Sequence, residues 1–374
     1  MSPVENSIYR VVNLRQNNIY LCPLRMEHPE HINTFLRSVN RDITTSLSLD
    51  RIRDDPTLNR LWEGEAEENA QCFLTQKLFT VKESDDYIQR DVKLPMAKDA
   101  IPDARPGFKV SGPRPDILYG YRTPRVFTEE QQDQLLSMGV PVFANSNNMT
   151  YPFLCIEAKG DRSARRGSLW VATNQCLGGS ASCVKITEHL NDELRKHNLK
   201  EVNSTVFSVA FHSTEARLYA TWKEDDEYYM GSVDNFLLHR PDHYLELHKY
   251  VQNIINWGRN TRLRSIRGAL DSLVEEEERK KVAQAKLEET VKEEEISEME
   301  EISEMGEISE WEETSGMRGR AASQARGRGA SQVSGRGVRG KRGTRGRIGT
   351  RGRGGPRGRG GPRGRSGPRG RSGQ

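Results

Sequence analysis

Two carboxylates and one lysine are the residues whose types and spacing could support catalysis. Glu157 and Lys159 stand two positions apart at the end of an apolar run, and Asp116 stands near the start of another run, 41 residues before Glu157. Side chains alternate between the two faces of a strand, so Glu157 and Lys159 leave one strand on the same face. If the two runs are paired strands, Asp116 joins them at the same edge of the sheet.

This grouping suits a divalent metal ion and a phosphate substrate. Two close carboxylates repel each other, and one takes up a proton unless a cation neutralises the pair. Mg²⁺ prefers oxygen ligands and keeps several waters. The metal could polarise a phosphate and generate hydroxide, while Lys159 orients the water or stabilises the pentavalent oxygens. Gln175, on the next helix, could help to position the nucleophile, and the nearby Arg162, Arg165 and Arg166 suit a phosphate backbone.

The same spacing has an ordinary structural explanation. A carboxylate two positions before a lysine recurs at Asp91-Val92-Lys93 and at Glu278-Arg279-Lys280. The first of these lacks a preceding apolar run, and the second lies in a charged helical segment. On the residues alone, a surface ion pair at the end of a strand is therefore the favoured interpretation of Glu157 and Lys159.

Short apolar runs bounded by Gly, Pro and Asn predict the strands that hold the three residues. They cover 115–121 and 151–159, with a short helix over 129–138 between them. The mixture of strands and helices without strict βαβ alternation predicts an α+β fold, a mixed-sheet α/β sandwich. The other predicted elements are a hairpin or extended strap over 8–24, a helix over 56–79, a helix over 168–198 interrupted at Gly178-Gly179, a hairpin of strands over 205–211 and 216–223, a strand over 228–238, and helices over 244–257 and 262–273.

Charge divides the chain into three regions. Residues 1–274 hold 34 basic and 36 acidic residues, whereas 275–313 carries a net charge of −12 and 317–374 a net charge of +18. Past residue 274 the apolar content is too low for a core. The expected organisation is an N-terminal extension over 1–55, a folded domain over 56–274, an acidic linker of helical and low-complexity sequence over 275–316, and a disordered Arg-Gly-rich tail over 317–374.

The tail is suited to binding nucleic acid. It holds 13 Arg-Gly dipeptides and no acidic or aromatic residue. Arginine forks bind phosphates bidentately, and a flexible polycation releases counterions, so DNA or RNA is the expected partner, with little sequence preference. The alternative is a solubilising tail without a selected function. The arginines expected to contact phosphate are Arg318, Arg326, Arg328, Arg336, Arg339, Arg345, Arg351, Arg353, Arg357, Arg359, Arg363 and Arg369.

Composition excludes several classes of protein. No apolar run approaches the roughly 18 to 20 residues that cross a bilayer, and the N-terminus lacks the features of a signal peptide. We therefore expect no membrane partner and an intracellular, preferentially nuclear, location. The five cysteines are an odd number without a CxxC pair, which predicts neither a disulfide framework nor a zinc site.

Pro115-Asp116, Glu157-Ala158-Lys159 and the following Gln175 resemble the motif of the PD-(D/E)XK nuclease superfamily. The chain is more closely similar to an uncharacterised nuclease-like family that is widespread in filamentous fungi, and the similarity covers residues 8–273. The tail resembles the Arg-Gly boxes of RNA-associated proteins, which are substrates of arginine methyltransferases. The stretches that carry the family resemblance are 17–21, 114–121, 151–153, 167–176, 214–219 and 256–259.

The superfamily resemblance implies a restriction-endonuclease-like αβββαβ core with extra N-terminal and C-terminal helices, and a Mg²⁺ or Mn²⁺ cofactor. Asp116 and Glu157 would bind the metal, and the lysine of the motif would be catalytic. A further metal ligand from the first helix would be Glu65, with Glu67 and Glu68 as competitors. Two functions stay open: a metal-dependent phosphodiesterase acting on nucleic acid, and a catalytically inactive nucleic-acid-binding or protein-interaction module of the same fold.

Overall fold

The fold is described here from a computed structural model. It consists of a unit over residues 1–300, which holds the sheet, and a second unit over 301–374. Among the helices that the structure describes, none combines the length and the apolar character of a membrane span. The described residues are 3–40, 47–56, 58–59, 75–79, 86–102, 107–159, 169–212 and 214–315.

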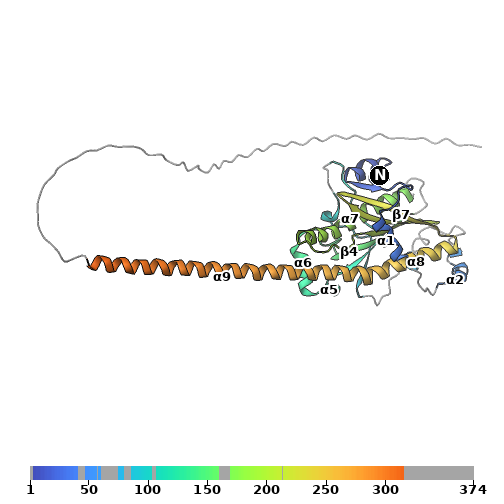
Figure 1. The fold of residues 1–374 in the computed structure, drawn as a ribbon. Coiled ribbons are helices and arrows are strands. Elements are labelled where there is room, and N and C mark those ends of the chain that lie inside the picture. The colour runs from blue at the N-terminus through green and yellow to red at the C-terminus, as the bar shows by residue number, and fades with distance from the viewer. Residues whose placement is uncertain are drawn as a thin grey trace, which may run out of the picture. The chain divides into compact units, whose positions relative to one another are not determined.

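One mixed sheet of seven strands organises the unit over residues 1–300, in the order β1-β7-β6-β5-β4-β3-β2 (Figure 1). The pairs β1–β7 and β4–β5 are parallel, and the other pairs are antiparallel. This confirms the predicted α+β class. The strands are β1 (Ile19–Leu21), β2 (Ile88–Val92), β3 (Ile117–Arg122), β4 (Met149–Ala158), β5 (Val206–Phe211), β6 (Glu215–Glu224) and β7 (Glu227–Leu237).

Helices cover both faces of the sheet. The long helix α7 packs on β4, β5 and β6, and on the other face the Phe35 and Trp257 rings contact Phe207 of β5. The helical elements are η1 (Pro3–Glu5), η2 (Arg10–Leu14), α1 (Glu30–Val39), α2 (Leu49–Arg53), η3 (Lys98–Ala100), α5 (Thr123–Val126), α6 (Glu129–Ser137), α7 (Leu169–Lys196), α8 (Pro241–Trp257), η4 (Gly258–Arg262) and α9 (Leu263–Ser315).

The strand β4 lies next to the central strand β5 of the sheet and is buried over its whole length. All ten of its residues are buried, because β3 and β5 flank it and helices cover both of its faces. A strand that is covered on both faces has a near-continuous apolar sequence, and such a run predicted this strand correctly.

The predicted interruption of a helix at Gly178-Gly179 is wrong, because α7 is one continuous helix of 28 residues. A Cβ atom on Gly179 would lie 3.0 Å from Cys155 Sγ, and one on Gly178 would lie 3.3 Å from Val110 Cγ1. The two glycines therefore allow α7 to approach β4 and the segment before β3. Because glycine has no side chain, α7 can pack closely here. This packing outweighs the low intrinsic helix propensity of glycine.

Of the two alternatives predicted for residues 8–24, a hairpin or an extended strap, the hairpin is wrong. The segment contains the π-helix η2 and then the single strand β1, which pairs in parallel with the distant strand β7. Between them Asn18 has a φ of +57°, a left-handed conformation that asparagine tolerates. The predicted helix over 56–79 falls mostly outside the described residues.

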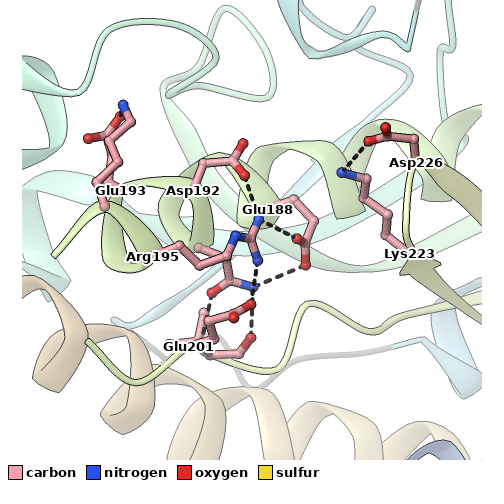
Figure 2. A network of polar contacts seen from close by, with 10 residues as sticks. Glu188, Asp192, Glu193, Arg195, Glu201, Lys223 and Asp226 are labelled. Atoms are coloured by element: carbon pink, nitrogen blue, oxygen red, sulfur yellow. Dashed lines mark hydrogen bonds and ion pairs between the residues drawn. The ribbon is translucent and has the colours of Figure 1, made fainter. Parts of the chain in front are cut away.

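Polar contacts fix the connection from α7 to β5 (Figure 2). The Arg195 guanidinium lies 2.5 Å from a Glu201 carboxylate oxygen and 3.4 Å from one of Glu188, and it also pairs with Asp192. Nearby, the buried Asn191 side chain accepts a hydrogen bond from Val202 N and donates one to Val202 O, at 2.9 and 3.0 Å. The exposed ion pairs contribute little each, so the buried amide contributes more to the entry into β5.

We predict that Gly258→Ala destabilises the fold by about 1–3 kcal/mol, because overpacking a full core displaces its neighbours. A Cβ atom at this position of η4 would lie 2.4 Å from Cζ of the buried Phe153 ring. Gly268→Ala in α9 is the control, because its Cβ atom would meet no atom within 4 Å. It should stabilise the protein by about 0.5–1 kcal/mol. Urea unfolding of both variants checks the prediction, and equal effects would contradict it.

Candidate functional site

The pairing of β3 with β4 brings Asp116 and Glu157 together, as the sequence predicted. Ile117 lies opposite Ile156 in this antiparallel pair, so the next position of the same register sets Asp116 opposite Glu157. The Ala158 N–H donates a hydrogen bond of 2.8 Å to Asp116 Oδ2. Directly opposed residues of an antiparallel pair point to the same face of the sheet. The two carboxylates therefore share one face, which is the face that α7 covers.

Glu157 is a buried carboxyl group with an unsatisfied oxygen. Its side chain is 1% exposed, and Oε1 has no hydrogen-bond partner among the described residues. Burial raises the pKa of Glu157 well above its usual range, and repulsion by Asp116 raises it further, while Lys159 opposes the shift. Without a cation beside it, the Glu157 carboxyl is therefore held in its protonated form over a wider pH range than an exposed glutamate.

Two lysines accompany the carboxylates. Lys159 continues from β4, where its N–H donates a hydrogen bond of 2.9 Å to Phe211 O of β5, and its side chain is half-buried. Lys93, which sequence reasoning missed, follows β2, and its Nζ lies 3.8 Å from Asp116 Oδ1. Because β2 pairs with β3, the Asp91-Val92-Lys93 segment ends beside the site. The sequence did contain a signal, the spacing of Asp91 and Lys93. It was set aside because no apolar run precedes these residues.

The neighbouring carboxylate of Asp91 has a structural role. It is buried and accepts hydrogen bonds from Gln89 Nε2, Asn145 Nδ2 and Asn147 Nδ2 at 2.9, 2.8 and 3.1 Å. Amide donors thus satisfy the hydrogen-bonding capacity of this buried carboxylate. Asp91 thus joins β2 to the turn before β4, in contrast to Glu157, whose oxygen lacks such partners.

Gln175 lies on α7 and faces a separate small cavity. This cavity of about 210 Å³ is lined by α7, by the N-terminal segment and by residues 111–114, and it includes Arg114, two positions before Asp116. The Gln175 Oε1 atom is buried and has no hydrogen-bond partner among the described residues. Gln175 therefore lies near residues 111–114, which precede Asp116. Within the described residues it donates no hydrogen bond to Asp116 or Glu157.

Several predicted site residues lie outside the described residues, and for them the structure tests nothing. They are Glu65 with its competitors Glu67 and Glu68, the loop arginines Arg162, Arg165 and Arg166, and all the tail arginines named above.

The donor chemistry of the site fits a hard divalent cation. Asp116 and Glu157 offer carboxylate oxygens, one of them buried and unpaired, and a cation would relieve their mutual repulsion. Within the described residues no group of three or more His, Cys, Asp and Glu side chains could hold a metal. Mg²⁺ does not require such a group, since one or two carboxylates with waters and substrate phosphates complete its shell.

The cysteines are core residues. Cys155, Cys176 and Cys183 are fully buried, and burial raises the pKa of each thiol above its usual range. Burial also raises the pKa of Cys22, to about 11. A thiol acts as a nucleophile through its thiolate, so these four cysteines are suited to packing and not to catalysis.

Comparison with known proteins identifies one domain. A family model described as "Domain of unknown function (DUF7924)" matches residues 24–270. The matched range contains Asp116, Glu157 and Lys159 and ends in the first turns of α9. No curated protein and no solved structure matches the chain.

We predict that metal-free protein loses stability as the pH rises from about 4.5, the ordinary pKa of a glutamate, toward the raised pKa of Glu157. In this window the folded state keeps a proton that the unfolded chain has released, so unfolding becomes more favourable by up to about 1.4 kcal/mol per pH unit. Glu157→Gln carries no titrating proton and should lack this loss. Its stability relative to the wild type should therefore increase with pH.

The measurement is urea unfolding in EDTA at a series of pH values. Glu224→Gln, at the exposed end of β6, is the matched control for removing one carboxylate. Parallel stability curves of the wild type and Glu157→Gln across the window would refute the assignment of a raised pKa to Glu157.

Proposed function

We propose, from the premise that the chain belongs to the DUF7924 family, that it is a Mg²⁺- or Mn²⁺-dependent phosphodiesterase of the PD-(D/E)XK type that acts on nucleic acid. The observation that carries the proposal is the pair formed by Asp116 and Glu157, with the unpaired Oε1 of Glu157 buried beside it. A structural carboxylate in this fold is satisfied by donors, as Asp91 is. Oε1 of Glu157 lacks a donor among the described residues, which is expected of a group whose partner is a ligand.

The order of elements supports this proposal. The chain runs β2-β3-β4-α7-β5, with β5 parallel to β4, and this order agrees with the βββαβ part of the core that the superfamily resemblance implies. Asp116 precedes the second of these strands and Glu157 lies near the end of the third, as in the motif. Lys159 follows Glu157 by two positions, directly after the end of β4.

Each residue of the site has a proposed role. Asp116 and Glu157 hold the cation, which when bound supplies Lewis acidity and lowers the pKa of a coordinated water. Lys159 orients the attacking water or stabilises the charge that develops on the phosphoryl oxygens. Lys93, at 3.8 Å from Asp116 Oδ1, orients that carboxylate. Gln175 keeps its proposed role in positioning the nucleophile, through a movement of its side chain out of the small cavity.

The Arg-Gly tail supplies affinity in this proposal. Its arginines bind phosphates of DNA or RNA without sequence preference, and they serve as substrates for an arginine methyltransferase. The nucleic-acid substrate and the polycationic tail favour a nuclear location.

One observation favours the alternative of a catalytically inactive binding module. Glu157 is 1% exposed, so a hydrated cation reaches its oxygen only after the surrounding side chains move. If they do not move, the same fold binds nucleic acid or protein without turnover. Metal binding to the purified protein separates the two functions.

We predict that the full-length protein cleaves nucleic acid in Mg²⁺ or Mn²⁺ and that EDTA abolishes the cleavage. Glu157→Gln should lose both metal binding and cleavage, because it removes a charged ligand. Lys159→Ala should retain metal binding but lose roughly a hundredfold or more in turnover, because it removes only the stabilisation of the transition state. Calorimetric titration with Mn²⁺ and a gel assay of single-stranded and double-stranded substrates measure the two effects.

Lys200→Ala, an exposed lysine in the connection after α7, is the matched control and should retain full activity. Full cleavage by Glu157→Gln would assign the activity to a contaminant or to another site. A wild type that binds Mn²⁺ but cleaves no substrate would establish the binding module instead.

We also predict that deleting residues 317–374 weakens nucleic-acid binding uniformly across sequences and flattens its salt dependence. If about six arginines contact phosphate at once, log K against log salt should have a slope near −4 to −5 in the full-length protein. Fluorescence anisotropy at several salt concentrations measures the slope. An unchanged slope after the deletion would place the main electrostatic contact in the folded unit.

A further inference from the structure

A second and larger cavity lies away from the two carboxylates. It has a volume of about 440 Å³ and is bounded by α1, by the connection before β5, by α8 and by η4. Among the described residues that line it, only Arg262 is charged, and Arg262 interacts electrostatically with Tyr151 of β4. Glu157 lies near the end of β4, six residues farther on, or on the order of 20 Å along the strand. The cavity is therefore separate from the proposed metal site.

Arg262 is a buried cation for which the described residues supply no counter-charge. Its side chain is 3% exposed, and its Nη1 and Nη2 groups donate hydrogen bonds of 2.6 Å to Asn203 O and 2.9 Å to Thr187 Oγ1. The guanidinium also lies over the Trp257 ring, 5.5 Å from its centroid. Its Nε is buried without a hydrogen-bond partner, and no carboxylate in the described part of the chain pairs with it.

This arrangement is costly in the absence of a ligand. An ionised group that leaves water is stabilised only if an opposite charge and enough hydrogen bonds replace its hydration. Burial lowers the pKa of Arg262, because removing the charged guanidinium from water is unfavourable. The neighbours that oppose this shift are two tyrosines and a cysteine. A guanidinium has five N–H donors, and Asn203 O and Thr187 Oγ1 accept from only two of them. The remaining donors are available to an anion.

The walls of the cavity are suited to an anion with several oxygens. No acidic side chain belongs to the described lining, whose aromatic members Phe35 and Trp257 offer apolar surface to an organic group. A carboxylate has two acceptor oxygens, whereas a phosphate has three or four and uses more donors. The amide and hydroxyl residues of the lining are Ser38, Asn203, Asn253, Asn256, Asn260, Thr261 and Ser265.

The backbone explains how an arginine comes to line this cavity. The chain passes from α8 to α9 (Figure 1), and between them lies the π-helix η4. The last residue of η4 is Arg262. A π-helical turn inserts extra residues into a helix and is frequent at functional sites. Gly258 opens this turn, and its carbonyl oxygen accepts a hydrogen bond of 2.7 Å from the Tyr121 hydroxyl. Within the segment 256–259, which the proposed nuclease site does not use, Asn256 and Trp257 line the cavity.

We propose that this cavity, the Arg262 pocket, binds a phosphate group, carried either by a small phosphorylated molecule such as a nucleotide or by the end of a nucleic-acid strand. Arg262 supplies the charge and its free donors, the amides and hydroxyls of the rim bind the outer oxygens, and Trp257 packs against the organic part. The volume lies in the range of small-molecule sites, about 300–1,000 Å³. The site requires neither a metal nor the proposed nuclease activity.

The test is phosphate binding by the full-length protein in EDTA, which silences the proposed metal site. Inorganic phosphate should raise the melting temperature saturably, beyond the effect of chloride at equal ionic strength. Arg262→Met preserves volume and removes the charge, and should weaken the calorimetric affinity for phosphate roughly tenfold or more, the worth of one charge-assisted hydrogen bond. The tail arginines are the same in both proteins, so the difference between them reports the pocket.

A second variant keeps the test valid if Arg262→Met does not fold. Ser265→Glu places a carboxylate at the exposed rim, where it should supply the missing counter-charge. It should raise the melting temperature without phosphate and abolish the response to phosphate. Gln284→Glu, an equal charge change on the exposed part of α9, is the matched control and should change neither. Identical phosphate responses in the wild type and Ser265→Glu, or no response in the wild type, would overturn the proposal.

Two further ligands distinguish the sources of the phosphate. If the wild type binds adenosine monophosphate more tightly than inorganic phosphate, and Ser265→Glu does not, the pocket is a small-molecule site. A preference for a 5′-phosphorylated oligonucleotide over its 5′-hydroxyl form, lost in the same variant, identifies the end of a strand.

Discussion

The register between β3 and β4 is the constraint on which the candidate site depends. Ile117 lies opposite Ile156, and only this register sets Asp116 opposite Glu157 on the face under α7. A shift by one residue would turn every side chain of one strand to the other face. The register is well determined, because β4 is buried over its whole length and its apolar residues pack against helices on both faces. The hydrogen bond from Ala158 N to Asp116 Oδ2 then closes the pair at its end.

Much of the fold could be predicted from local pattern, and the errors arose where distant contacts decide the structure. The strands β3 and β4 are apolar runs, and α6 begins at a capping box and ends before a glycine with a φ of +79°. The strand β2 escaped prediction because its buried Gln89 and Asp91 look like surface residues. Their partners besides each other are Asn145 and Asn147, more than fifty positions away. Gly178-Gly179 was misread for the same reason, since Val110 limits the space at Gly178 and Cys155 limits it at Gly179.

The site shows the same division between local and distant information. Alternation along a strand was enough to group Glu157 with Lys159, and the apolar run before Asp116 was enough to suggest its partner strand. Lys93 could not be added from sequence, because its position follows from the pairing of β2 with β3. The lack of a partner for Glu157 Oε1 is a property of the packed surroundings. No pattern of residue types reveals which carboxylate a fold leaves unsatisfied.

Glu157 and Arg262 are buried groups of opposite sign associated with opposite ends of β4, and the question arises whether they compensate each other. At a separation on the order of 20 Å and an effective dielectric constant of about 20, their attraction amounts to about 0.8 kcal/mol. Burying either charge costs several kcal/mol. Their mutual attraction is therefore too weak to stabilise both, and each end needs a partner of its own. Burial keeps a proton on Glu157 over a wider pH range than on an exposed glutamate, an option that an arginine lacks at physiological pH. The guanidinium of Arg262 has hydrogen bonds but no counter-charge among the described residues, so it constrains its surroundings more strongly than the carboxyl group does, and the partner that we propose for it is an anion in the Arg262 pocket.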